Sequence, residues 1–263
     1  MAQTWFVLLT VGFSAGLLGG LLGIGGGIIL MPVLRFCIGL SPAAAAGTTV
    51  AAVFCTTLGG GIKHYRLGHV PLRDLLPVIF SGAASTLVFS VLFIQLARRG
   101  PWLDFGIGCV FSILSLRIIW DIVSNRYGDP DDALSTSTIQ GTMAGKVILG
   151  GIAGILPGLF GIGTGAVLVP AFRYFFKKPV KVAIGSALVC FCANALISAV
   201  MKYTQGYVDP GPALPICLGC LAGSQLGAVI NHRAPSRMLM LLFGLAFLWV
   251  SAQFIATGLK GAP

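Results

Sequence analysis

The sequence predicts an all-α polytopic membrane protein built from two inverted-topology repeats. Three observations support this prediction: an apolar composition, a series of long charge-free runs, and a self-similarity at one fixed offset. Of the 263 residues, 56% are hydrophobic and only 9% are charged, against about a quarter in an ordinary soluble domain. A soluble fold needs polar residues to cover its outside, so we expect the outer surface of this chain to face lipid.

Runs without Asp, Glu, Lys or Arg locate the membrane segments. Residues 1–34 form the first run, which is too long for a single crossing of about 20 residues. The later runs cover residues 36–62, 75–97, 105–116, 147–172, 182–201, 210–231 and 238–259. The short run at 105–116 reaches Trp120 if Arg117 extends toward the interface. We therefore expect about 8–10 membrane segments, and no cleaved signal peptide because the basic stretch that precedes one is missing.

The chain repeats itself at an offset of 138 residues. Residues 20–35 align with residues 158–173, and nine of those 16 positions are identical. The same offset continues through the half, pairing Gly47 with Gly185, Tyr65 with Tyr203, Gly68 with Gly206 and Pro77 with Pro215. Agreement at one offset over a whole half indicates a duplication. We predict a first repeat over 1–122, a polar cytoplasmic linker over 123–142 and a second repeat over 143–263.

The basic residues favour inverted over parallel halves. If each half has an odd number of crossings, twelve of the 17 Lys and Arg lie on the linker side. The other five are Arg35, Arg98, Arg99, Lys202 and Lys260. An even number of crossings would divide the charges nine to eight, and the positive-inside rule prefers the uneven division. We therefore place the linker in the cytoplasm and both termini outside.

Each half begins with a glycine-rich stretch inside an apolar run, residues 23–27 and 161–165. Glycine costs about 1 kcal/mol relative to alanine in a helix, and a helix that restarts after a break directs free N–H groups and a positive dipole end at that break. The segment either crosses the membrane or forms a re-entrant hairpin. The predicted anion donors are the amides of Gly25, Gly26, Gly27, Gly163, Thr164 and Gly165. A methyl group at Gly25 or Gly163 is then expected to take the space of the anion, whereas close helix packing through glycine is the alternative.

Polar residues on the following helix of each half are further candidates. Thr48 and Thr56 are eight residues apart and share a helix face. Their partners at the 138-residue offset are Ser186 and Asn194, and Thr49 adds a third hydroxyl to the first half. Hydroxyl and amide groups donate to an anion without adding a fixed charge. Hydrogen bonding between helices is the alternative role for all five residues.

Among the charged residues, Arg35 and Arg173 occupy equivalent positions, each three residues after a proline. Either they attract an anion from a vestibule or they anchor the end of a span at the interface. The group Lys63, His64, Arg66 and His69 is expected to form a solvated cytoplasmic loop. The spans carry no deep Asp or Glu that predicts a carboxylate relay, so a coupling proton is left open.

Several function classes fit the sequence poorly. An enzyme would need a nucleophile–base pair or a metal cluster within the spans, and we find neither; no cofactor is predicted. The seven cysteines lie in apolar stretches and are expected to be small packing residues. Despite a net charge of +10, the basic residues sit between apolar runs, which argues against a nucleic-acid partner. A transporter is favoured over a passive channel because inverted repeats with broken helices are typical of transporters.

The two glycine motifs resemble those of the sulfite exporter TauE/SafE family of bacterial membrane transporters. They read L-G-I-G-G-G-x-x-x-x-P over 22–32 and F-G-I-G-T-G-x-x-x-x-P over 160–170, and an A-x-G-T-T segment follows over 45–49. The resemblance runs from residue 8 to about residue 255. It implies secondary transport, by alternating access, of sulfite, thiosulfate, sulfoacetate or a related organosulfonate. Lipid is then the other partner, and a passive channel or a transporter of a non-sulfur anion stays an alternative.

Overall fold

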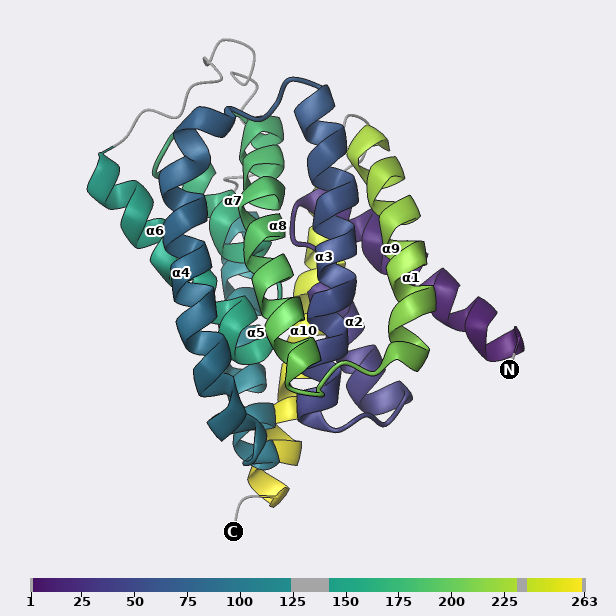
Figure 1. The fold of residues 1–263 in the computed structure, drawn as a ribbon. Coiled ribbons are helices and arrows are strands. Elements are labelled where there is room, and N and C mark those ends of the chain that lie inside the picture. Colours follow the sequence, from purple (N-terminus) through teal and green to yellow (C-terminus); the bar gives the residue numbers. More distant parts are fainter. Residues whose placement is uncertain (1, 124–141, 231–235, 262–263) are drawn as a thin grey trace.

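The computed structural model describes residues 2–123, 142–230 and 236–261, all without a β-strand (Figure 1). The elements are, in chain order, α1 (Ala2–Leu22), α2 (Gly27–Pro32), the π-helix η1 (Val33–Cys37), α3 (Pro42–Arg66), α4 (Leu72–Ala97), α5 (Gly100–Val123), α6 (Met143–Phe160), α7 (Gly165–Tyr174), α8 (Val180–Thr204), α9 (Pro210–Ile230) and α10 (Ser236–Gly261). Nearly all of the linker predicted over 123–142 lies outside the described residues. The seven cysteines are free thiols.

Six of the described helices are long and apolar enough to cross a membrane: α1, α3, α4, α6, α8 and α9. The helices α5 and α10 have 24 and 26 residues, whereas α2 and α7 have only 6 and 10. The prediction of an all-α polytopic fold is therefore confirmed, and the chain is a multi-pass membrane protein.

The ends of the long helices follow from local sequence. Pro42 opens α3 directly after Ser41, whose hydroxyl accepts a hydrogen bond of 3.2 Å from the Ala44 amide; proline and serine are preferred at these two positions. Gly68 and Gly206 lie two residues past the ends of α3 and α8, with φ of 76° and 78°. Glycine adopts this left-handed conformation without strain, which explains why the repeat keeps glycine at both positions.

The two helices α3 and α8 lie at the centre of the bundle. In Figure 1 they stand between α4 and α6 on one side and α1 and α9 on the other. They run antiparallel, because Gly61 near the end of α3 lies beside Val189, and Gly185 near the start of α8 lies beside His64. Residues 42–66 are the most deeply buried of the candidate spans. The centre of the protein is therefore made by one helix from each half.

Glycines spaced four residues apart bring two further helix pairs into backbone contact. Along α1, Gly12, Gly16 and Gly20 pack on the backbone of Ile216, Cys220 and Ser224 in α9. Along α6, Gly150, Gly154 and Gly158 pack on the backbone and side chains of α4 around Val78, Gly82 and Thr86. A Cβ atom at any of these six glycines would collide with the facing helix. Close packing, the alternative considered for the glycine-rich stretches, thus explains the glycines inside α1 and α6.

The helix contacts are preserved when the two halves are exchanged. The pair α1–α9 becomes α6–α4, while α3–α8 and α5–α10 map onto themselves. The pair α5–α10 is antiparallel, with Gly108 beside Ile255, Gly258 beside Phe105, and a hydrogen bond of 3.0 Å from Ser112 to Ser251. Antiparallel counterparts are what inverted halves require. The inversion itself stays a prediction, which these contacts support.

Candidate functional site

Both glycine motifs form breaks between helices. After α1 ends at Leu22, the chain turns through Gly23, Gly25 and Gly26, whose φ values are 74°, 78° and 71°. The second break, between α6 and α7, contains Gly161 with φ of 67°. Only glycine reaches this region freely, so these breaks, predicted from the motifs, follow directly from the residue type.

The two breaks contact each other. A Cβ atom built on Gly27 would lie 3.2 Å from the amide nitrogen of Gly163, and one on Gly165 would collide with the Gly23 carbonyl. Helical hydrogen bonding resumes at Ile29 in the first half and at Val167 in the second. The amides that precede these residues open the new helices and have no partner within them. The breaks thus bring two helix N-termini to one place.

Phe191 of α8 fills the space beside both breaks. Its ring would lie 2.5 Å from a Cβ atom on Gly25 and 3.1 Å from one on Gly163, and Val53 of α3 adds a contact at 3.3 Å. Both side chains are fully buried. In this conformation a methyl group at Gly25 would meet aromatic and aliphatic side chains. The expectation that it takes the space of an anion therefore stays a prediction, which requires Phe191 to move.

Three of the predicted polar residues each have a buried side-chain atom without a hydrogen-bond partner. Thr164 and Ser186 are fully buried, and Asn194 is 1% exposed. The Thr164 and Ser186 hydroxyls and the Asn194 side-chain oxygen make no hydrogen bond. Thr164 precedes the first residue of α7, and the Asn194 amide lies against Gly82 of α4. Buried polar groups are nearly always satisfied in proteins, so these are the atoms of the predicted set that remain available to a ligand or to water.

The threonines of the first half already have partners. Thr48 accepts a hydrogen bond of 3.0 Å from the Asp209 amide, which ties α3 to the segment before α9. Thr49 donates to the sulfur of Met31 at 3.6 Å. Thr56 donates to the Ala52 carbonyl at 3.2 Å. For these three residues the structure favours the alternative role, hydrogen bonding within the helix bundle.

Thr49 and Thr56 nevertheless lie on the side of α3 that faces the first break. A Cβ atom on Gly27 would lie 3.4 Å from the Thr49 methyl, and one on Gly26 would lie 3.6 Å from the Thr56 hydroxyl. Thr48 instead contacts the loop before α9. The structure thus brings Thr49 and Thr56 to the glycine break and leaves Thr48 away from that surface.

Arg35 is held in an ion pair. Its guanidinium donates to both carboxylate oxygens of Asp104, at 2.8 and 3.2 Å, and to the Leu40 carbonyl at 3.0 Å. The carboxylate is almost completely buried, and Arg35 is 20% exposed. This geometry fits anchoring better than a free vestibule charge. The counterpart of Asp104 at the 138-residue offset is Leu242, so the pair is not repeated for Arg173.

Two basic residues lie elsewhere than predicted. Lys202 is fully buried and His64 is 1% exposed, although both were expected in loops. The reason is that α3 and α8 continue through these residues to Arg66 and Thr204, beyond the end of each charge-free run. The two residues are also partners at the 138-residue offset, which is the sequence signal that could have identified them.

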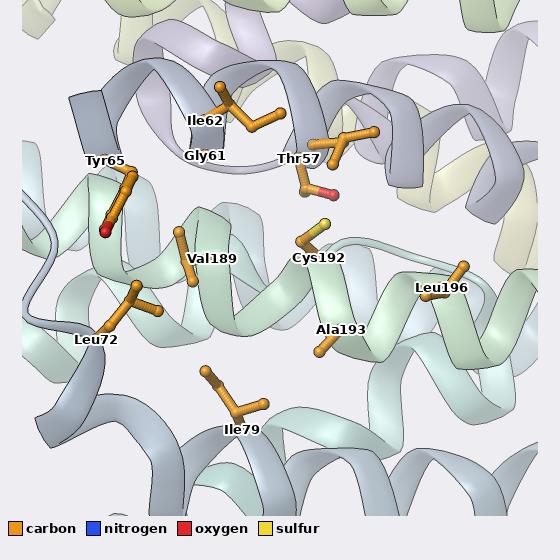
Figure 2. Close-up of a pocket in the computed structure, with 11 residues that line it drawn as sticks. Thr57, Gly61, Ile62, Tyr65, Leu72, Ile79, Val189, Cys192, Ala193 and Leu196 are labelled. Carbon is orange, nitrogen blue, oxygen red and sulfur yellow. The ribbon is translucent and has the colours of Figure 1, made fainter. Parts of the chain in front are cut away.

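A groove of about 370 Å³ opens between α3, α4 and α8 (Figure 2). Aliphatic and aromatic side chains form most of its wall, and Thr57 and Cys192 approach each other across it. Thr57 donates to the Val53 carbonyl at 2.9 Å. The lining is Thr57, Leu58, Gly61, Ile62, Tyr65, Leu72, Ile79, Val189, Cys192, Ala193 and Leu196, without a charged side chain. This groove therefore offers little to an anion.

Known proteins resemble this chain over nearly its whole length. The probable membrane transporter protein YunE of Bacillus subtilis is 26% identical over 272 residues, which cover 98% of this chain and 99% of that protein. A probable membrane transporter protein of Methanocaldococcus jannaschii is 26% identical over 255 residues, 90% of each chain. Sulfite exporter TauE/SafE family protein 6 of Arabidopsis thaliana is 33% identical over 107 residues, 40% of this chain and 25% of that protein. No solved structure matches.

The family profile agrees with the two glycine motifs. The profile described as sulfite exporter TauE/SafE matches residues 8–254, which include both breaks and all of the central helices α3 and α8. The resemblance of the motifs to this family is thereby confirmed. The chain belongs to the sulfite exporter TauE/SafE family of membrane transporters.

Proposed function

We propose that the chain is a secondary transporter, not an enzyme, that carries a small sulfur-containing anion across the bacterial inner membrane by alternating access. The anion is sulfite, thiosulfate, sulfoacetate or a related organosulfonate. One observation carries the proposal: Thr164, Ser186 and Asn194 are buried polar residues with unsatisfied side-chain atoms. Leaving such a group unsatisfied costs about 1–3 kcal/mol each, a cost that a bound anion would offset for the Thr164 and Ser186 hydroxyls, which can donate to it. The unsatisfied Asn194 oxygen is an acceptor, so Asn194 would contact the anion through its NH₂ group while the oxygen takes a donor such as water.

The chemistry of the breaks suits an oxyanion. The helix N-termini at Gly27 and Gly165 offer roughly half an elementary positive charge each. The hydroxyl of Thr164, the residue directly before α7, adds a further hydrogen-bond donor. A permanent charge at membrane depth costs at least about 2.5–3.5 kcal/mol by insertion scales. Dipoles and hydroxyls avoid that cost, and they bind weakly enough for a transporter to release its substrate.

Binding requires the breaks to open. Phe191 packs against Gly25 and Gly163, and the two breaks pack against each other. We therefore assign this conformation to a closed state and Phe191 to the gate. A shift of its ring would uncover the amides of both breaks together, because the same ring contacts both of them.

Counterflow in proteoliposomes tests the proposal. The purified protein is loaded with one unlabelled anion, and uptake of labelled sulfite, thiosulfate, sulfoacetate or sulfate is followed with and without a pH gradient. Accumulation of a sulfur anion that depends on internal substrate supports the proposal. Conductance without counterflow would identify a passive channel, and exchange of non-sulfur anions alone would overturn the substrate class.

A matched pair of variants separates substrate binding from folding. Thr164→Val removes a hydroxyl that makes no hydrogen bond, so the fold loses nothing while the anion loses a donor. Thr86→Val removes a hydroxyl that donates to the Gly154 carbonyl at 3.0 Å. A hydrogen bond to a charged group contributes about 1.5–3 kcal/mol, so Thr164→Val should weaken anion binding at least tenfold with an unchanged melting temperature. Thr86→Val should show the reverse pattern.

A further inference from the structure

The ammonium of Lys202 is completely surrounded by the protein. Its Nζ donates to the Pro157 carbonyl at 3.0 Å, the Gly158 carbonyl at 2.7 Å and the Ser198 hydroxyl at 3.0 Å. It also lies 4.2 Å from the centre of the buried Phe93 ring. A lysine ammonium has three N–H donors, and here each has one oxygen acceptor. The group is therefore saturated as a cation by three neutral oxygens and an aromatic face.

Two of these oxygens, the Pro157 and Gly158 carbonyls, belong to the end of a broken helix. Pro157 and Gly158 lie in the last turn of α6, which ends at Phe160 directly before the second break. The last four carbonyls of a helix lack intrahelical partners and carry the negative end of the dipole. In transporters with discontinuous helices, such half-helix ends coordinate the coupling cation. Lys202 thus occupies a place suited to a monovalent metal ion.

The first half completes its break differently. At the 138-residue offset, Gly19 corresponds to Pro157, and its carbonyl accepts the Gly23 and Gly25 amides at 3.0 and 3.5 Å. That turn uses three glycines with positive φ, whereas Gly161 is the one such residue in the second break. The backbone of the first break therefore satisfies the Gly19 carbonyl in the last turn of α1. In the second half a side chain from α8 does so.

We infer that the Pro157 and Gly158 carbonyls and the Ser198 hydroxyl form a monovalent-cation site, which the chain fills with its own Lys202 ammonium. The wild-type protein then needs no sodium at this position. Removing the side chain beyond Cβ should leave a cavity that takes a primary alkylammonium of three carbons, or a sodium ion. This inference concerns the cation that holds the end of α6, and it does not depend on which anion is carried.

Chemical rescue of Lys202→Ala tests the site. The melting temperature of the full chain in detergent is measured against rising n-propylammonium, which replaces the lost atoms, and against sodium. The variant should melt several degrees below wild type and recover with n-propylammonium or sodium. Tetramethylammonium, which has no N–H donor, and 1-propanol, which has no charge, should give no recovery. Lys260→Ala, at an exposed lysine of α10, is the matched control and should respond to none of them.

The outcomes separate clearly. Recovery confined to Lys202→Ala supports the site; no recovery by either cation, or an equal response in Lys260→Ala, overturns it. If Lys202→Ala does not fold, amine acylation followed by mass spectrometry applies the test to the wild type and to Ser198→Ala. Lys202 should resist acylation in the folded wild type while Lys260 reacts, and Ser198→Ala should increase its reactivity. A Lys202 that reacts as readily as Lys260 in the wild type contradicts the inference.

Discussion

Arg35 and Asp104 join the π-helix η1 to α5 through three hydrogen bonds, one of 2.8 Å and two of 3.2 Å. The pair fixes the chain where it leaves the first break and turns toward α3, since the same guanidinium also holds the Leu40 carbonyl at 3.0 Å. Asp104 is 1% exposed. Its charge therefore depends on Arg35 for compensation.

Breaking this pair should destabilise the protein more than it affects substrate capture. Removing one partner of a buried ion pair costs about 3–5 kcal/mol, because the other charge is left buried. Arg35→Gln should lower the melting temperature markedly, and adding Asp104→Asn should recover part of the loss. Thermal unfolding of the purified variants measures both. An Arg35→Gln protein with wild-type stability and slowed anion uptake would instead restore the vestibule role.

Gly25→Ala should impair both folding and transport. Its methyl group would meet the Phe191 ring, and alanine would be strained at a φ of 78°. A left-handed alanine costs roughly 1–2 kcal/mol, and the collision adds to it. Adding Phe191→Leu should recover the part of stability lost to the collision, as read from melting temperatures. Equal stability of Gly25→Ala with and without Phe191→Leu would show that backbone strain alone is responsible.

Asn194→Leu should abolish transport while the protein still folds. The side chain is buried against Gly82 with an unsatisfied oxygen. A leucine of similar size has no polar atom, so it removes the free-energy cost of that unsatisfied oxygen from the substrate-free protein. Binding isotherms and melting curves on the purified variant provide the measurement. Normal anion affinity in Asn194→Leu would assign this amide to structure, whereas a stable variant without binding assigns it to the substrate.

Equivalent helix ends of the two halves should lie on opposite faces of the membrane. Arg66 and Thr204 are partners at the 138-residue offset, both exposed and both last in their helices, α3 and α8. Single cysteines at these positions, in a chain without other cysteines, can be labelled with an impermeant maleimide in sealed vesicles. Inverted halves predict that one position reacts from outside and the other after permeabilisation. Labelling of both from the same side would contradict the inversion.

The sequence predicted the features that depend on residue type alone. Gly23, Gly25, Gly26 and Gly161 break helices because glycine adopts the required φ without strain, and charge-free runs located the spans because lipid excludes charge. Gly68 and Gly206 ended helices at equivalent positions for the same conformational reason. The conformational preference of glycine and the absence of charge are local properties, so the sequence of a single segment is enough to predict them.

Features that depend on distant packing escaped prediction. Lys202 directly follows the charge-free run 182–201 and was expected between apolar runs, but α8 continues through it and its ammonium donates to a carbonyl of α6. The space at Gly25 is set by Phe191, a residue far along the chain. Nothing local to Asp104 indicates that it pairs with Arg35, which lies 69 residues earlier in the chain. Side-chain partners across the bundle are fixed by the fold, so they appear only once the helices are assembled.

The glycine face of α1 constrains the order of biosynthesis. Gly12 and Gly16 pack on Ile216 and Cys220 of α9, so their partners leave the ribosome about 200 residues later, which at 5–20 residues per second means roughly 10–40 s. During that interval the three glycines of α1 lack the helix on which they pack in the folded protein. The contact of α6 with α4 closes much sooner because α4 is already inserted. The last two helices complete their pairs at the end of synthesis, α9 with α1 and α10 with α5. A ribosome that stalls before α9 therefore leaves a nascent chain whose first helix is unmatched and open to quality-control proteases.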